Sequence, residues 1–247
     1  MDRVIYTAMT GAKYTLEQQG AVANNLANVD TAGFKEALHR LRAVPVQTQA
    51  LPSRAFTVDA TVATNFEAGP LDYTGRPLDA AIEGQGWFAV QTPDGGEAYT
   101  RAGNFQLSAN GILQLPSGQP VLGEDNQPVA LPPDREFTIG KDGTISAVDP
   151  TNTQVTEVVG RLKLVNPPVE NLQRGEDGLF RLQEGGASPM DETVQVSSGY
   201  LEKSNVSLVD QMVRMIALAR QFEMNTKAIT TAQENDARAS SILSPAR

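Results

Sequence analysis

The 247-residue sequence contains no cysteine and only one histidine, His39. Without cysteine there can be no disulfide framework, thiolate nucleophile or cysteine-ligated metal, and one histidine cannot supply a histidine-rich metal site. Acidic residues outnumber basic ones by 29 to 20, which gives a formal net charge of −9. This charge argues against nucleic acid and against an anionic membrane surface as partners, because both attract clustered lysine and arginine.

Long apolar runs are also missing from the sequence. No stretch approaches the roughly 18 apolar residues that a membrane-spanning helix needs, so we expect a protein that is not integral to a membrane. Ala21-Val22-Ala23 matches the small-residue cleavage pattern of a signal peptide, but polar residues interrupt the stretch before it. We therefore expect no cleaved signal, and any export from the cytoplasm would use another route.

The parts of the common catalytic sites are absent as well. His39 has no nucleophile elbow nearby, and no glycine-rich loop forms a phosphate-binding motif. The one enzymatic alternative is a glycosidase-like carboxylate pair among Asp72, Asp79 and Glu83, which precede Trp87-Phe88. We favour the simpler interpretation that these carboxylates are solvated turn and strand-edge charges. We expect no catalytic residue, no metal, no cofactor and no small-molecule substrate.

What the sequence does contain is a long amphipathic helix at each end, over residues 5–26 and 208–229. In both, mainly apolar or small residues recur at alternating spacings of four and three, which is the seam pattern of a coiled coil. The predicted seams are Ile5, Met9, Ala12, Leu16, Gln19, Ala23 and Leu26 in the first helix, and Leu208, Met212, Met215, Ala219, Phe222, Thr226 and Ile229 in the second. The pattern predicts that the termini pair with each other. The alternative is two ordinary amphipathic helices, each packed on the middle of the chain.

Three asparagines stand near the end of the first helix, at Asn24, Asn25 and Asn28. Asparagine is a weak helix former, so the cluster is explained if the amides hydrogen-bond across a helix interface and fix its register. It is also explained as the end of the helix, with Asn28 or Gly33 in the left-handed conformation.

The second helix has a clear predicted start. Ser207 precedes Leu208, and Asp210 follows three residues after the serine, as in the acidic variant of the capping box. We expect this helix to continue to about Ser240 or Ser241.

Between the helices the sequence is β-like. Prolines at 45, 52 and 70 predict an extended connector with short strands over residues 36–70. Over residues 71–201, short apolar runs alternate with turn residues, and Asn110-Gly111 is the dipeptide that a two-residue hairpin loop prefers. The predicted class is α+β. Residues 1–35 and 202–247 form a coiled-coil-like α domain of paired terminal helices, and residues 71–201 form a mainly antiparallel β domain.

Three motifs resemble those of the flagellar rod and hook axial proteins. They are residues 23–35 (ANNLANVDTAGFK), residues 99–105 (YTRAGNF), and the start of the last helix over residues 204–223. They occur in the order found in that family. Residues 1–9, 71–79, 160–165 and 177–182 are most similar to the proximal-rod type, with a distal-rod member as the alternative.

The resemblance implies a structural subunit of the bacterial flagellar basal body. Such a subunit is exported uncleaved through the flagellar export apparatus and assembles in the periplasmic rod with other rod proteins. Its own copies are a further candidate partner. It also implies that the terminal helices line the central channel, that the β domain lies outside them, and that the rod transmits torque. A low-copy junction between rod segments is a further alternative. The seams and the resemblance together place the assembly interface on Ile5, Met9, Ala12, Leu16, Ala23, Asn24, Asn25, Leu26, Asn28, Leu208, Met212, Met215, Ile216, Ala219, Phe222 and Ile229.

This interface gives a first prediction. Changing Ala23 or Ala219 to a large charged residue such as glutamate should block assembly while the β domain still folds, because only the seam is disturbed. Rod content of purified basal bodies, together with circular dichroism of the purified chain, measures both effects. Normal rods in such variants would contradict the interface.

Overall fold

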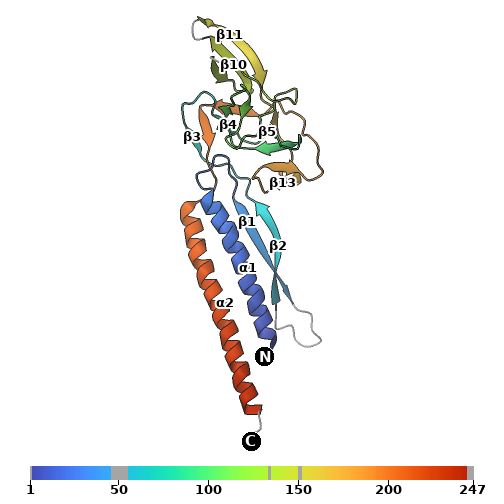
Figure 1. Cartoon of the computed structure of the whole chain (residues 1–247), viewed down its shortest axis with the longest axis vertical. Coiled ribbons are helices and arrows are strands. Elements are labelled where there is room, and N and C mark those ends of the chain that lie inside the picture. The colour runs from blue at the N-terminus through green and yellow to red at the C-terminus, as the bar shows by residue number, and fades with distance from the viewer. Residues whose placement is uncertain (1, 46–54, 133–134, 150–151, 244–247) are drawn as a thin grey trace. The chain divides into compact units, whose positions relative to one another are not determined.

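The computed structural model describes residues 2–45, 55–132, 135–149 and 152–243 (Figure 1). These residues divide into two compact units. The first, which we call the helical unit, draws on the stretches Met1–Asn28, Glu36–Asn65 and Val206–Arg247. The second, the β-rich unit, comprises Val29–Lys35 and Phe66–Asn205.

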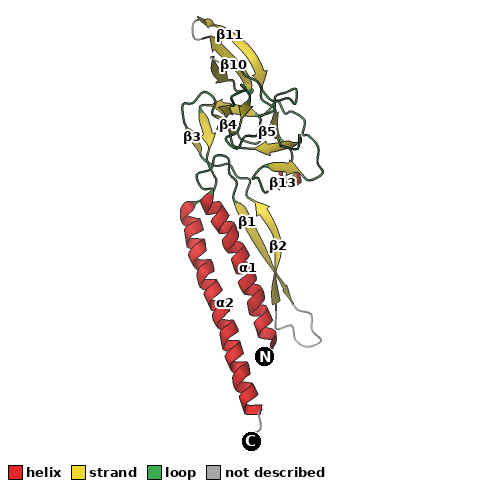
Figure 2. Ribbon diagram, viewed as in Figure 1, coloured by secondary structure: helices red, strands yellow, loops and turns green. Residues whose placement is uncertain are grey.

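The helical unit contains the two terminal helices, α1 (Asp2–Ala27) and α2 (Leu208–Leu243), which contact each other and run in opposite directions (Figures 1 and 2). With 36 residues, α2 is on the order of 54 Å long at about 1.5 Å per residue. It begins where the capping pattern predicts, and the Asp210 amide donates to Ser207 Oγ at 3.4 Å.

A β-hairpin completes this unit. Strand β1 (Ala37–Pro45) pairs antiparallel with β2 (Ala55–Thr64), and both strands contact α1. This differs from the connector with short strands expected for residues 36–70. Pro45 is the last residue of β1 and Pro70 follows β2, while Pro52 lies outside the described residues. The two described prolines therefore flank the strands and do not interrupt them, which is where proline is tolerated.

The β-rich unit is built from short antiparallel ladders. Its strands are β3 (Leu71–Tyr73), β4 (Ala80–Glu83), β5 (Trp87–Gln91), β6 (Glu97–Thr100), β7 (Gln106–Leu107), β8 (Leu113–Gln114), β9 (Glu136–Ile139), β10 (Thr144–Asp149), β11 (Asn152–Arg161), β12 (Leu164–Val165), β13 (Leu172–Arg174), β14 (Phe180–Leu182), β15 (Gln195–Ser198) and β16 (Tyr200–Glu202), with a 3-10 turn η1 at Val169–Asn171. One sheet has the order β12-β5-β6-β14-β13 and another β11-β10-β9, and two-stranded ladders join β15 to β4, β16 to β3 and β7 to β8. The α+β class with a mainly antiparallel β region is confirmed.

Strand β5 shows why its sequence is a continuous apolar run. Successive side chains of a strand point to opposite faces of the sheet. Phe88 packs in one hydrophobic cluster, where its ring meets Phe105 edge to face at 5.1 Å. Trp87 packs in a second cluster with Phe66 and Phe180. The five-stranded sheet is therefore covered on both faces, and the run needs no polar alternation.

The hairpin at Asn110-Gly111 is present, but its loop has three residues. Ser108 donates its amide to the Ile112 carbonyl at 2.9 Å, and Gly111 has a φ of 74°. Three-residue hairpin loops place a left-handed residue last, so a single glycine suffices. The dipeptide located the turn correctly, and the loop length differs by one residue.

The core generates a prediction about alkaline pH. Tyr99 of β6 is fully buried and its hydroxyl accepts the Ser188 amide at 2.8 Å. Burial, helped by the nearby Glu97 carboxylate, raises the pKa of the Tyr99 phenol. The unfolded phenol ionises near pH 10, so the stabilisation is complete below that pH and is lost as the pH rises above it.

We therefore expect wild-type protein to lose unfolding free energy relative to Tyr99→Phe as the pH increases beyond about 10. Urea unfolding of both proteins at pH values on either side measures the difference. A gap between the two proteins that does not change with pH would contradict the assignment.

Candidate assembly interface

The contact between α1 and α2 uses small and polar residues. Asn225 of α2 donates from Nδ2 to Thr15 Oγ1 at 3.4 Å, and Thr15 in turn donates to the Gly11 carbonyl at 2.8 Å. A β-carbon on Gly11 would lie 3.4 Å from the Asn225 amide, so the glycine lets the helices approach closely. On α2, the partly buried positions among the described side chains are Met215, Leu218, Phe222, Asn225, Ile229, Ala232 and Ala239.

The predicted seams therefore coincide only in part with the contact face. Met215, Phe222 and Ile229 lie on it, but Met9 and Leu16 are 52% and 51% exposed. The remaining predicted seam positions divide between exposed residues, namely Ala23, Leu208, Met212, Ala219 and Thr226, and partly buried ones, namely Ile5, Ala12, Gln19 and Leu26. On α1, the predicted row therefore includes two large residues that face outward, Met9 and Leu16. The residues that contact α2 include glycine and threonine, which apolar spacing does not identify.

The asparagine cluster connects a helix to a strand. Asn25 is buried, and its side-chain amide both donates to and accepts from the backbone of Ala37 in β1, each at 2.9 Å. Asn28 donates to the Asn24 carbonyl at 2.9 Å. The left-handed residue is Gly33, with a φ of 69°. The cross-helix amide is thus Asn225, which the sequence analysis did not single out.

An exposed apolar patch covers the first turns of α2. It consists of Leu208, Val209, Met212, Val213 and Ile216, which are 43% to 68% exposed. We call these five residues the α2 patch. Contiguous exposed apolar surface of this kind marks interaction sites, because its contact with water is unfavourable. Three predicted interface residues, Leu208, Met212 and Ile216, belong to it, together with Val209 and Val213, which were not predicted.

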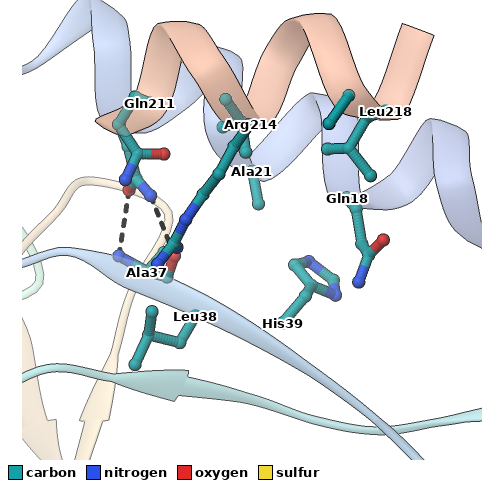
Figure 3. A pocket seen from close by; sticks show the side chains of 11 residues that line it. Gln18, Ala21, Ala37, Leu38, His39, Gln211, Arg214 and Leu218 are labelled. Carbon is teal, nitrogen blue, oxygen red and sulfur yellow. Dashed lines mark hydrogen bonds between the residues drawn. The ribbon is translucent and has the colours of Figure 1, made fainter. Parts of the chain in front are cut away.

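A groove of about 310 Å³ lies between α1, α2 and β1 (Figure 3). Gln211, Arg214 and Leu218 come from α2, and His39 of β1 lies beside Gln18 of α1 (Figure 3). His39 is partly buried in this wall.

Two of the family-like motifs contribute side chains to a buried charged cluster in the β-rich unit. Lys35 Nζ is 2.6 Å from Glu202 Oε1, and Arg101 Nη1 is 3.1 Å from Glu202 Oε2. Lys35 and Glu202 are 1% exposed and Arg101 is 5% exposed. We call these three side chains the Glu202 cluster. Burial lowers the pKa of the Lys35 ammonium and of the Arg101 guanidinium, and the Glu202 carboxylate opposes both shifts.

Backbone groups complete this cluster. Lys35 Nζ donates to the Glu67 carbonyl at 2.7 Å, and Glu202 Oε1 accepts the Gly69 amide at 3.0 Å. Arg101 Nη2 donates to the Gly84 carbonyl at 2.7 Å. The cluster therefore fastens the segments at residues 33–35, 67–69 and 202, which adjoin the points where the chain passes between its units.

The motif glycines are required by close backbone contacts. At Gly33, which donates its amide to the Glu202 carbonyl at 2.7 Å, a β-carbon would come within 2.3 Å of the Arg101 backbone. At Gly103, a β-carbon would lie 1.6 Å from the Ala80 carbonyl oxygen. Two family-like motifs thus meet in space, and side chains at these positions would displace the backbone.

The three carboxylates on which the glycosidase alternative rests each make local contacts. Asp72 lies 3.0 Å from Lys203, Asp79 accepts the Thr74 hydroxyl at 2.6 Å, and Glu83 accepts from Ser197. Across the described ranges no three metal-ligating side chains gather. Neither described helix is long and apolar enough to span a membrane.

Known proteins are similar to this chain along nearly its whole length. Family models described as Flagella basal body rod protein, Flagellar hook protein FlgE/F/G D1 domain and Flagellar basal body rod FlgEFG protein C-terminal match residues 5–35, 81–147 and 197–242. Flagellar basal-body rod proteins FlgF of Escherichia coli K12 and Salmonella typhimurium are each 47% identical over 99% of both chains. FlgG of Bacillus subtilis is 35% identical over 95% of this chain and 96% of its own.

The Glu202 cluster yields a stability prediction. Glu202→Gln leaves two buried cations without a counter-ion, so we expect a loss of about 3–5 kcal/mol in unfolding free energy. The matched control is Asp72→Asn, which removes a carboxylate from an exposed pair with Lys203 and should cost at most about 1 kcal/mol. Denaturant unfolding measures the loss of unfolding free energy in both variants. Equal losses would show that the Glu202 cluster stabilises the protein no more than an exposed ion pair does.

Proposed function

This chain belongs to the family of flagellar basal-body rod proteins, and from that premise we propose that it forms the proximal segment of the rod through its terminal helices. The resemblance found in the sequence is confirmed, and the chain is a structural rod subunit. Its 47% identity to two relatives named FlgF, against 35% to a relative named FlgG, supports the proximal type over the distal one.

The observation that carries the proposal is the α2 patch. Its residues lie on a helix that already contacts α1 through another face, so the patch is available to a neighbouring subunit. Burying one such side chain is worth roughly 1.5–3 kcal/mol. A subunit that buries several of them against its neighbours gains enough to drive assembly, and Met9 and Leu16 are further exposed apolar side chains on α1.

The same arrangement supports a mechanical role. Helices held by lateral contacts resist being pulled past one another, so torque applied at one end of the rod passes from subunit to subunit. We propose coiled-coil-like contacts, through the outward α1 row and the α2 patch, as the means of that transfer. In this proposal the chain is not an enzyme. It leaves the cytoplasm through the flagellar export apparatus, and its partners are other rod proteins in the periplasm.

The α2 patch generates a prediction about assembly. Met212→Glu or Ile216→Glu places a charge in a surface that neighbouring subunits would bury, and should abolish motility and remove the chain from purified basal bodies. The matched control is Gln233→Glu, which makes the same change at an exposed polar position of α2 and should leave motility intact. Urea unfolding of all three variants should match wild type, because the residues are exposed. Motile cells carrying either patch variant would overturn the proposal.

The number of copies in each rod separates a proximal or junction subunit from a distal one. Quantitative mass spectrometry of basal bodies should find a handful of copies for a proximal or junction subunit and dozens for a distal one.

A further inference from the structure

Gln211 has an unsatisfied acceptor in the groove between α1, α2 and β1. The residue is 1% exposed, and its Nε2 donates to Glu36 Oε1 at 2.8 Å. That bond fixes which way the amide points, because a carboxylate accepts only from the nitrogen. Its Oε1 is buried and has no hydrogen-bond partner among the described residues. A buried acceptor left in this state costs free energy, so a donor from outside the chain would be favourable there.

The groove around this acceptor suits an apolar side chain with a donor at its end. Ala21 and Val22 of α1 and Ala217 and Leu218 of α2 contribute to its walls. The Glu36 carboxylate adjoins Gln211 and lies 3.4 Å from Arg214. The groove therefore combines apolar walls with a buried acceptor that lies beside the Glu36–Arg214 ion pair.

The chain itself carries a surface of the complementary kind. Val209, Val213, Ile216 and Arg220 follow one another at spacings of four, three and four, which places them on one face of α2. The three apolar residues are 68%, 61% and 57% exposed, and Arg220 is also exposed. We call these four residues the docking row. It presents three apolar side chains and then a guanidinium that can only donate.

We propose that the docking row of one copy occupies the groove of a second copy, with the Arg220 guanidinium donating to Gln211 Oε1 beside Glu36. This inference rests on the proposed function and specifies the partner and the contact. The α2 residues of the groove, which include Gln211, Arg214 and Leu218, alternate with the docking row along the helix and occupy a different face. Row and groove of one copy therefore bind two different neighbours, which gives a head-to-tail contact that continues from copy to copy.

The absence of cysteine makes a direct test possible. Cells would make two copies of the full chain, one tagged and carrying Ile216→Cys in the docking row, the other carrying Ala217→Cys at the groove. Both positions are exposed. A short thiol-reactive cross-linker is applied to purified basal bodies. In the matched control, Gln233→Cys replaces Ile216→Cys, at an exposed position of the same helix outside the docking row.

We expect a tagged–untagged cross-linked dimer several-fold more abundant than in the control. A dimer no more abundant than the control, in rods that contain both copies, would overturn the inference while the proposed function stands. Cross-linking of the groove thiol to a different rod protein would contradict the inference that a second copy of this chain occupies the groove. Absence of the wild-type chain from rods would overturn the proposed function and the inference together.

A second measurement does not depend on rod assembly. Sedimentation of the purified full chain gives the strength of self-association for Arg220→Met, Gln211→Met and the double variant. A hydrogen bond with one charged partner predicts that each single change weakens association about tenfold to a hundredfold. The double variant should be no weaker than the single ones, because the same bond is lost. Losses that simply add would overturn the contact, as would self-association unchanged by either substitution.

Discussion

The β-rich unit depends on one carboxylate, that of Glu202. It lies between the Lys35 ammonium and the Arg101 guanidinium, and it also accepts the Gly69 amide. These groups are far apart in the sequence, at residues 35, 69, 101 and 202. Folding must therefore bring all of them together before any of the charges can be buried favourably. Gly33 has no side chain because the Arg101 backbone occupies that space. Two of the family-like motifs, residues 23–35 and 99–105, thus each contribute one cation to this buried cluster.

The terminal helices follow a different logic. Their mutual contact combines Gly11, Thr15 and Asn225 with partly buried apolar residues of α2. Several other large apolar side chains, such as Met212 and Ile216, remain exposed. A chain that existed only as a monomer would gain by burying those side chains. Keeping them outward makes sense if neighbouring subunits supply the cover. The helical unit therefore carries exposed apolar surface that contact with a neighbouring subunit would bury.

Much of this arrangement could be predicted from the sequence, and the exceptions have physical causes. The capping pattern at Ser207 located the start of α2, and apolar runs with turn residues located β5 and its neighbours. The α1 contact face was missed because glycine and threonine carry no hydrophobic periodicity. The Glu202 cluster was missed because its members are 66 and 101 residues apart along the chain, and only the fold brings them together. The sequence did carry one indication of the cluster, which is a basic residue in each of two motifs. Lys35 lies in residues 23–35, and Arg101 lies in residues 99–105.

Native-state amide hydrogen exchange tests the central role of the Glu202 cluster most directly. The amides to follow are those of Gly33 and Gly69, which donate to the Glu202 backbone carbonyl and side chain at 2.7 and 3.0 Å. If the cluster holds the β-rich unit together, both amides exchange only when the unit unfolds, as slowly as the core amide of Ala89. Exchange of Gly33 and Gly69 as fast as that of the exposed turn at Gly95 would contradict the account.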